Sequence, residues 1–236
     1  MTQSEDPRRE PLERKGVVYV VRDHFAVVVH LALLLGSARV WGWYNAFVVA
    51  GVMLAIKSTT AIVCLRINPA VLNARGTKHE MSGKEKAFFA VFVPASLALP
   101  VVAGFEVGTH GWTHASVTEL AAGLVMMVAG GSIGIAALAA NAFFEPTVRV
   151  QSDRDHQVCT SGPYRFVRHP GYVSAMMVVL SVPLILGSRW AFVPAAVECI
   201  ALVVRTAHED ALLRTELAGY AEFARSTRYR LFPLLW

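Results

Sequence analysis

Long apolar stretches constrain this chain more than any other feature of its sequence. Six can be read, centred on residues 25–35, 45–65, 87–105, 118–140, 172–186 and 190–204. A helix that crosses a bilayer needs about 17 to 25 mostly apolar residues. The runs therefore predict membrane-spanning helices. A hydrophobic content of 55% with 17% charged residues agrees with this and excludes a disordered chain or an ordinary water-soluble domain.

The last two apolar runs predict a tight helical hairpin, because only residues 187–189 separate them. About fifteen residues at about 1.5 Å each give a helix of roughly 22 Å, which is shorter than a hydrocarbon core of about 30 Å. Two interpretations stay open for this hairpin. It is either tilted across the bilayer or only partly inserted.

The fold class predicted is all-α: a polytopic membrane helical bundle with about five to six transmembrane segments. We divide the chain into a cytosolic tail (1–16), a region of four transmembrane helices (17–142) and a carboxyl-terminal core (143–236) that holds the polar motifs described below. An even number of crossings places both chain ends on one side of the membrane.

The basic residues indicate which side this is. Nineteen of the 22 lysines and arginines fall in the two termini or in the segments 66–86 and 149–168, which a six-span topology puts together. By the positive-inside rule this side is cytosolic. The charge of +5 is thus explained by topology, and no nucleic-acid partner is predicted. Cys64, Cys159 and Cys199 are too scattered for a zinc knuckle or a redox pair.

Two features inside the predicted spans have alternative explanations. Lys57 lies about 13 Å inside the inner boundary if its segment is helical. It either lines a polar cleft, or it snorkels or pairs with a neighbour such as Asp23. Gly130, Gly131 and Gly134 resemble part of a phosphate loop, but no strand precedes them, so close helix packing is the better explanation.

Polar residues are concentrated in the interval from Asn141 to Tyr172, on the predicted cytosolic side. Gly162-Pro163 and Pro170-Gly171 interrupt any continuous helix here, because proline removes a backbone donor and glycine permits positive φ. We expect an ordered connector at the membrane face. His156 and His169 give no support for a metal site, and no metal is predicted.

A second concentration of polar residues follows the predicted hairpin. Arg205 and Glu209 are four residues apart, so on a helix they project from one face. They either address one ligand together or form an intrahelical ion pair.

These two concentrations carry a family resemblance. The segments are His156-Gln157-Val158-Cys159-Thr160-Ser161-Gly162-Pro163-Tyr164, then Arg168-His169-Pro170-Gly171-Tyr172, then Arg205 with Glu209-Asp210. Their order and spacing resemble the isoprenylcysteine carboxyl methyltransferase family, and more broadly the integral-membrane methyltransferases that include phospholipid N-methyltransferases. The resemblance covers about residues 143–233. Before that it depends on hydropathy, with a looser likeness from Asn68-Pro69 to Lys86.

The resemblance implies a pocket for S-adenosyl-L-methionine at the cytosolic membrane face. Carried over from the family, the cofactor-binding residues are His156, Gln157, Val158, Cys159, Tyr164, His169, Pro170, Gly171, Tyr172 and Glu209. Gln151 is a looser match, because its spacing to His156 is shorter here. Arg205 takes the place of the family's substrate-side arginine and is the expected catalytic residue. Where the family often has two consecutive glutamates, this chain has Glu209-Asp210.

The implied reaction is carboxyl O-methylation of a C-terminal isoprenylcysteine or a similar lipophilic carboxylate. A carboxylate is ionised at neutral pH, so the transfer requires placement more than a base. We expect Arg205 to hold the acceptor, Glu209 to accept hydrogen bonds from the cofactor, and Tyr164 and Tyr172 to pack against it.

Three other functions stay open. They are a phospholipid or amine N-methyltransferase, an NADPH-dependent membrane sterol or enone reductase, and a membrane scaffold without catalysis. In each case the expected location is a membrane, with lipids as neighbours. This would be the bacterial inner membrane, a source weakly indicated by 17 arginines against 5 lysines, or the endoplasmic reticulum if the source is eukaryotic.

Overall fold

The structure, a computed structural model, describes residues 11–77, 79–110, 115–233 and 235–236. The predicted tail 1–16 lies outside this description up to residue 10. In chain order the helices are α1 (Arg14–Ala38), α2 (Tyr44–Ile67), α3 (Pro69–Gly76), α4 (Gly83–His110), α5 (Val117–Ala140), the 3-10 turns η2 (Ser152–Arg154) and η3 (Gly162–Arg165), α6 (Pro170–Leu186), α7 (Phe192–Glu216) and α8 (Tyr220–Ser226). No strand occurs in the described part of the chain, so the all-helical prediction is confirmed.

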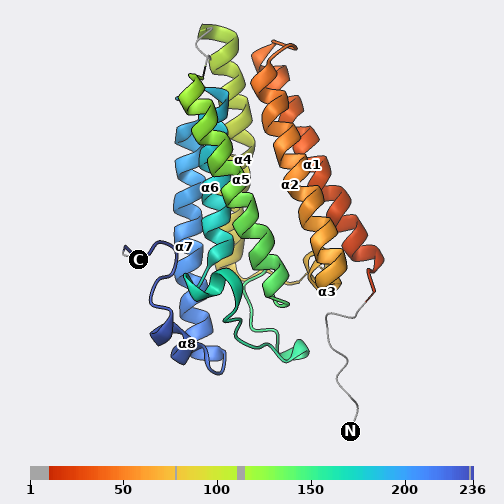
Figure 1. Cartoon of the computed structure of the whole chain (residues 1–236), viewed down its shortest axis with the longest axis vertical. Helices are drawn as coiled ribbons and strands as arrows, with labels where there is room; N and C mark the ends of the chain where they lie inside the picture. Colours follow the sequence, from red (N-terminus) through yellow and green to blue (C-terminus); the bar gives the residue numbers. More distant parts are fainter. Residues whose placement is uncertain (1–10, 78, 111–114, 234) are drawn as a thin grey trace.

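Six long helices run along the long axis of the molecule (Figure 1). By length and composition, α1, α2, α4 and α5 can each cross a membrane, and α6 is a shorter apolar helix. Many large apolar side chains on these helices are exposed, for example Phe25, Ile62, Phe105 and Val125. Such a surface suits lipid rather than water. The prediction of a polytopic helical bundle is therefore confirmed.

Glycines bring α5 and α6 into close contact. A Cβ atom on Gly130 would lie 2.8 Å from the Cβ of Met177, and one on Gly134 would lie 2.5 Å from the Oγ of Ser174. On its other side α5 meets α2, where a Cβ on Gly131 would overlap Ile56. Close helix packing is thus confirmed as the role of these glycines.

The turn between α6 and α7 covers residues 187–191, two residues more than the predicted 187–189, so the predicted hairpin is present with a slightly longer turn. Gly187 ends α6 with φ of 70°, and a Cβ there would lie 2.6 Å from the backbone nitrogen of Ala115. Glu106 of α4 is buried against this turn and accepts hydrogen bonds from the Ser188 hydroxyl and the Trp190 backbone N–H. The hairpin is therefore fixed at its tip by a carboxylate from a third helix.

Lys57 pairs with Asp23 across α1 and α2. Its Nζ lies 2.7 Å from Asp23 Oδ1, and both side chains are partly buried. The alternative that paired Lys57 with a neighbour is the one that the structure supports, as expected for an ionisable group within a span.

Helix α3 and the connector 141–169 lie at the same end of the bundle as α8 (Figure 1). Helices α4 and α6 begin at this end, and α2, α5 and α7 finish there. No helix was predicted between Asn68 and Lys86, but α3 lies there. Pro69 at its first position starts α3, because proline needs no hydrogen bond there.

Candidate active site

The connector 141–169 is an ordered segment held by its own side chains. Gln151 is 1% exposed, and its amide nitrogen donates to the carbonyl of Phe143 at 2.7 Å. The backbone N–H of Gln151 also donates to Nδ1 of His156 at 3.3 Å. Gly162 takes φ of 58°, which permits the turn at η3. These bonds fix the connector across the end of the bundle.

Beneath the connector lies a cavity of about 280 Å³. Helices α3, α4, α6 and α7 contribute to its wall together with the connector, α8 and the α7–α8 junction. The predicted site residues that line it are Gln151, His156, Gln157, Val158, Cys159, Tyr164, His169, Gly171, Tyr172, Arg205 and Glu209. Two motifs more than thirty residues apart thus meet at one cavity.

Pro170 is the predicted site residue that does not line the cavity. It is the first residue of α6 and is buried. Its neighbour Gly171 forms part of the wall, and a Cβ there would lie 2.3 Å from the ring of Phe144. This pair places the start of α6 directly against the connector.

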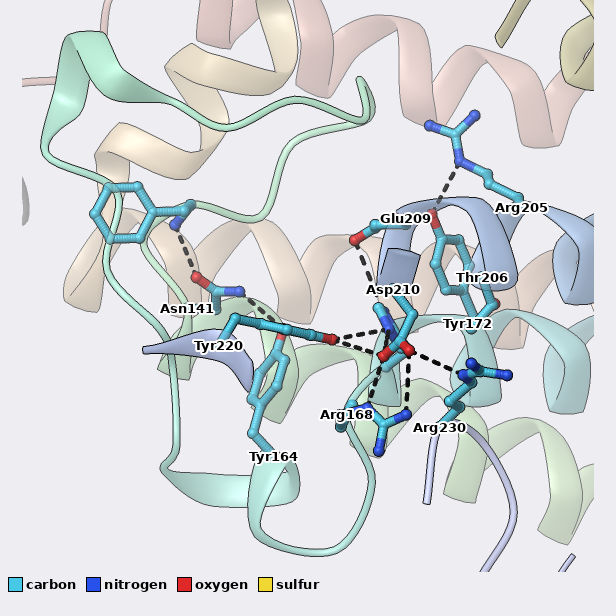
Figure 2. A network of polar contacts seen from close by, with 12 residues as sticks. Asn141, Tyr164, Arg168, Tyr172, Arg205, Thr206, Glu209, Asp210, Tyr220 and Arg230 are labelled. Carbon is cyan, nitrogen blue, oxygen red and sulfur yellow. Dashed lines mark hydrogen bonds and ion pairs between the residues drawn. The ribbon is translucent and has the colours of Figure 1, made fainter. Parts of the chain in front are cut away.

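Arg205 and Glu209 are joined through Tyr172 (Figure 2). Nε of Arg205 donates to the Tyr172 hydroxyl at 2.9 Å, and that hydroxyl donates to Oε2 of Glu209 at 2.5 Å. Neither of the two alternatives predicted this bridge, and no direct ion pair links the two side chains. The tyrosine fixes the guanidinium and the carboxylate relative to each other within the cavity.

Arg205 is 6% exposed and most of its donors are used. Nη2 donates to the Pro146 carbonyl, and it also lies 3.8 Å from Oε1 of Glu85. The guanidinium carbon is 4.4 Å from the ring centre of Phe88, a cation–π distance. Nη1 is buried and has no hydrogen-bond partner among the described residues. Such an atom in a cavity wall is an available donor for a ligand.

Glu85 connects the start of α4 to the connector. It forms a capping box with Ser82 and accepts a 2.8 Å hydrogen bond from the backbone N–H of Val148. Because its carboxylate also approaches Arg205, the beginning of α4 helps to position the cavity's main cation.

Asp210 is the centre of a buried polar network (Figure 2). Its side chain is fully buried. The nearest donor is Nε of Arg168 at 2.7 Å, and the others are His169, Arg214, Tyr220 and Arg230. Burial raises the pKa of Asp210, but these hydrogen bonds outweigh it and hold the pKa well below its ordinary value. Asp210 thereby ties the connector, α7, α8 and the tail together.

The His156 ring packs against the Phe143 ring, with ring centres 4.6 Å apart and planes inclined at 31°. Burial, and then the nearby cations Arg149 and Arg154, lower its pKa to about 4. The imidazole is therefore neutral at physiological pH and can accept or donate a hydrogen bond without adding charge to the cavity.

Tyr164 forms part of the wall beside the end of α5. Its hydroxyl accepts a 3.1 Å hydrogen bond from the side-chain amide of Asn141. The side-chain oxygen Oδ1 of Asn141 in turn accepts a hydrogen bond from the backbone N–H of Phe143. Burial raises the pKa of Tyr164, so its phenol stays neutral. The ring offers an apolar face held at a fixed angle.

Several cavity residues were not predicted from the sequence. Arg75 comes from α3, Phe88 and Phe89 from α4, and Tyr220 and Phe223 from α8. These residues lie outside the two motifs, and only tertiary packing brings them to the connector. Within the described residues, no cluster of three potential metal ligands occurs.

These observations define a class: a multi-pass helical membrane protein with an enzyme-like cavity, lined by aromatic rings and a few fixed charges, at one end of its bundle. The family resemblance is confirmed by comparison with known families. The model of the isoprenylcysteine carboxyl methyltransferase (ICMT) family matches residues 123–215, which span most of α5, the connector, α6 and nearly all of α7. The match supports a methyltransferase-like membrane enzyme. No curated protein matches the chain.

Proposed function

We propose that the protein is an S-adenosyl-L-methionine-dependent methyltransferase that esterifies the carboxylate of a lipophilic acceptor, such as a C-terminal isoprenylcysteine. The observation that carries this proposal is the buried, unpartnered Nη1 of Arg205 in the cavity wall. A guanidinium donor with no partner is suited to a carboxylate, because charge-assisted hydrogen bonds are the strong ones.

The residues of the cavity fit the methyl donor. Neutral aromatic rings at Tyr164, Tyr172 and Tyr220 offer faces for an adenine and for a positively charged sulfur. Glu209 offers carboxylate oxygens to hydroxyl or ammonium groups. In this proposal Gln151, His156, Gln157, Val158, Cys159, His169, Pro170 and Gly171 complete the cofactor site, Pro170 by starting α6 rather than by contact.

When bound, S-adenosyl-L-methionine supplies a methyl group on positively charged sulfur, and the carbon–sulfur electron pair stays on sulfur as the acceptor oxygen takes the methyl. Arg205 orients the acceptor carboxylate for in-line attack. Tyr172 holds the Arg205 guanidinium and the Glu209 carboxylate at a fixed relative position through its two hydrogen bonds. No proton is transferred, so no residue has to act as a base.

The apolar part of the acceptor has a place on the side of the cavity toward the bundle. Phe88, Ala175 and Leu202 line that side, from α4, α6 and α7 respectively. A lipid tail can approach between these helices from the bilayer while its carboxylate meets Arg205. We further propose that the cavity faces the cytosol, in accord with the basic residues at this end of the bundle.

The test supplies the purified protein in nanodiscs with methyl-labelled S-adenosyl-L-methionine, and with either N-acetyl-S-farnesylcysteine, its carboxamide, or a membrane lipid extract. We expect label in a base-labile methyl ester of the acid and none in the carboxamide. Base-stable label in an amine lipid would favour an N-methyltransferase. NADPH oxidation with an enone acceptor would favour a reductase, and no binding of an adenosyl cofactor would favour a scaffold.

A further inference from the structure

Arg75 is a second cation in the wall of the cavity, and the function proposed above does not use it. It lies on α3, outside the segment that matches the family. Its Nε donates to the Tyr19 hydroxyl at 2.8 Å. The guanidinium carbon lies 5.1 Å from the ring centre of Tyr19 and 5.4 Å from that of Phe144. These contacts hold the side chain from two sides.

One donor nitrogen of Arg75 lacks a partner in the part of the chain that the structure describes. Nη1 is buried and has no hydrogen-bond partner among the described residues. No described carboxylate forms an ion pair with this arginine, and the nearby Asp23 is engaged with Lys57. A buried guanidinium nitrogen without a partner is costly, so it indicates a ligand.

The four arginines that line the cavity divide into two kinds. Arg168 is paired with Asp210 and Arg149 with Glu145. Arg75 and Arg205 each keep a buried Nη1 without a partner, and both line the cavity. In the described chain, three other side chains have a buried polar atom without a hydrogen-bond partner. They are Trp43, Asn68 and His79, and none of them lines the cavity. The wall of the cavity therefore includes two arginines, on α3 and α7, that each have one buried donor nitrogen without a described partner.

The position of Arg75 is fixed by the docking of α3 on α1. A Cβ on Gly76 would lie 2.0 Å from the carbonyl oxygen of Lys15, so only glycine permits this approach. Asn73 accepts a hydrogen bond from the backbone of Glu13 and donates one to the carbonyl of Pro11. A guanidinium held on so tightly docked a helix is organised for its ligand before binding.

We propose that Arg75 binds the amino-acid carboxylate of the methyl donor, and this inference rests on the function proposed above. Two arginines of one cavity each have a buried nitrogen without a described partner, which suits two anions. The proposed reaction brings two carboxylates, one on the acceptor and one on the donor. Arg205 takes the acceptor's carboxylate. Arg75, beside Phe144 and the start of α6, takes the donor's.

The experiment measures binding rather than turnover. Isothermal titration compares the wild-type protein and Arg75→Gln with S-adenosylhomocysteine and with its decarboxylated analogue, which lacks the carboxylate. Arg75→Gln should weaken S-adenosylhomocysteine about 10- to 100-fold, the usual range for a lost charged hydrogen bond. The decarboxylated analogue should bind the two proteins equally. Arg75→Lys should recover part of the loss.

Lys84→Gln is the matched control, because Lys84 is an exposed cation at the same end of the bundle. It should leave both ligands unaffected. Tyr19→Phe keeps the charge of Arg75 but removes its hydrogen bond, and it should weaken S-adenosylhomocysteine by a few-fold.

Three outcomes would overturn the inference. Equal binding of S-adenosylhomocysteine by wild type and Arg75→Gln would remove Arg75 from the site while leaving the proposed function intact. N-acetyl-S-farnesylcysteine is titrated in the same way, and loss of its binding alone in Arg75→Gln would assign Arg75 to the acceptor instead. If the wild-type protein bound no adenosyl ligand, both the inference and the proposed function would fail.

Discussion

Arg205 shows how a single side chain in this protein is divided between structure and ligand. Its Nε and Nη2 are bound to Tyr172 and to Pro146, and the rings of Phe88 and Phe89 lie within cation–π distance. Only Nη1 is left for another molecule. This arrangement depends on the planar, forked geometry of arginine, which lysine does not share.

Replacing Arg205 with lysine tests that dependence. Arg205→Lys keeps the charge but cannot serve Tyr172 and an acceptor together, so we expect kcat/KM for N-acetyl-S-farnesylcysteine to fall at least about tenfold. Affinity for S-adenosylhomocysteine, measured in parallel, should change much less. A variant that methylated at the wild-type rate would disprove the orienting role.

His156 gives a prediction for pH. Its pKa of about 4, against an ordinary 6.5, means that the folded protein prefers the neutral ring. The unfolded chain takes up the proton first as the pH falls, so this residue's contribution to stability is complete above about 6.5 and is lost from there toward 4. A titration of ¹⁵N-labelled histidine should place its midpoint near 4. A midpoint near 6.5 would show that the ring is not buried as described.

At the scale of elements, α5 and α6 depend on small residues for their contact. Lipid supplies no hydrophobic force between helices, so close packing has to provide the stability. A Cβ on Gly130 would meet the Cβ of Met177 and the carbonyl oxygen of Ser174. The second of these is a backbone atom, which cannot move without its helix.

Gly130→Ala should therefore lower the free energy of unfolding by about 1–3 kcal/mol, the usual cost of overpacking. Gly51→Ala on α2 is the control, since a Cβ there meets nothing within 4 Å. It should change stability by less than about 1 kcal/mol. Unfolding in bicelles gives both values, and an equal effect of the two substitutions would contradict the close contact.

Asp210 is the corresponding feature of the connector and the carboxyl-terminal segments. Asp210→Asn leaves Arg168 buried beside a neutral side chain, so we expect a loss of about 3–5 kcal/mol in unfolding free energy. Glu216→Gln, exposed near the end of the same helix, should have little effect. Thermal unfolding of the variants in detergent measures this difference. Wild-type stability in Asp210→Asn would show that the network does not hold the site together.

For the whole molecule, the even number of long helices brings the connector, α3 and α8 to one end (Figure 1). That end carries most of the basic residues, which favours the cytosolic side. The residues beside the cavity and those of the turn between α1 and α2 should therefore lie on opposite sides of the membrane.

Cysteine labelling checks this topology. In a background without the native cysteines, Gly42→Cys should react with an impermeant maleimide on intact cells, and Lys84→Cys and Glu222→Cys should react only after lysis. All three positions are exposed. Labelling of Lys84→Cys and Glu222→Cys from opposite sides would contradict the bundle, and labelling of both from outside would reverse its orientation.

The helical membrane class, the short hairpin and the role of Gly130, Gly131 and Gly134 could be predicted from the amino-acid sequence. These features follow from local composition, because the cost of burying backbone in lipid allows few folds. The paired motifs also indicated that Arg205 and Glu209 share a site with the connector.

The contacts that complete the site could not be predicted and depend on the packing of the helices. The bridge through Tyr172 and the contact of Glu85 with Arg205 join residues that are 33 or more positions apart. The unpartnered donor of Arg75 comes from yet another helix. The spacing of Arg205 and Glu209 predicted either an ion pair or a shared ligand, but the Tyr172 hydroxyl lies between the two side chains. Such contacts depend on which helices meet at one end of the bundle, and neither spacing nor hydropathy along the chain records that.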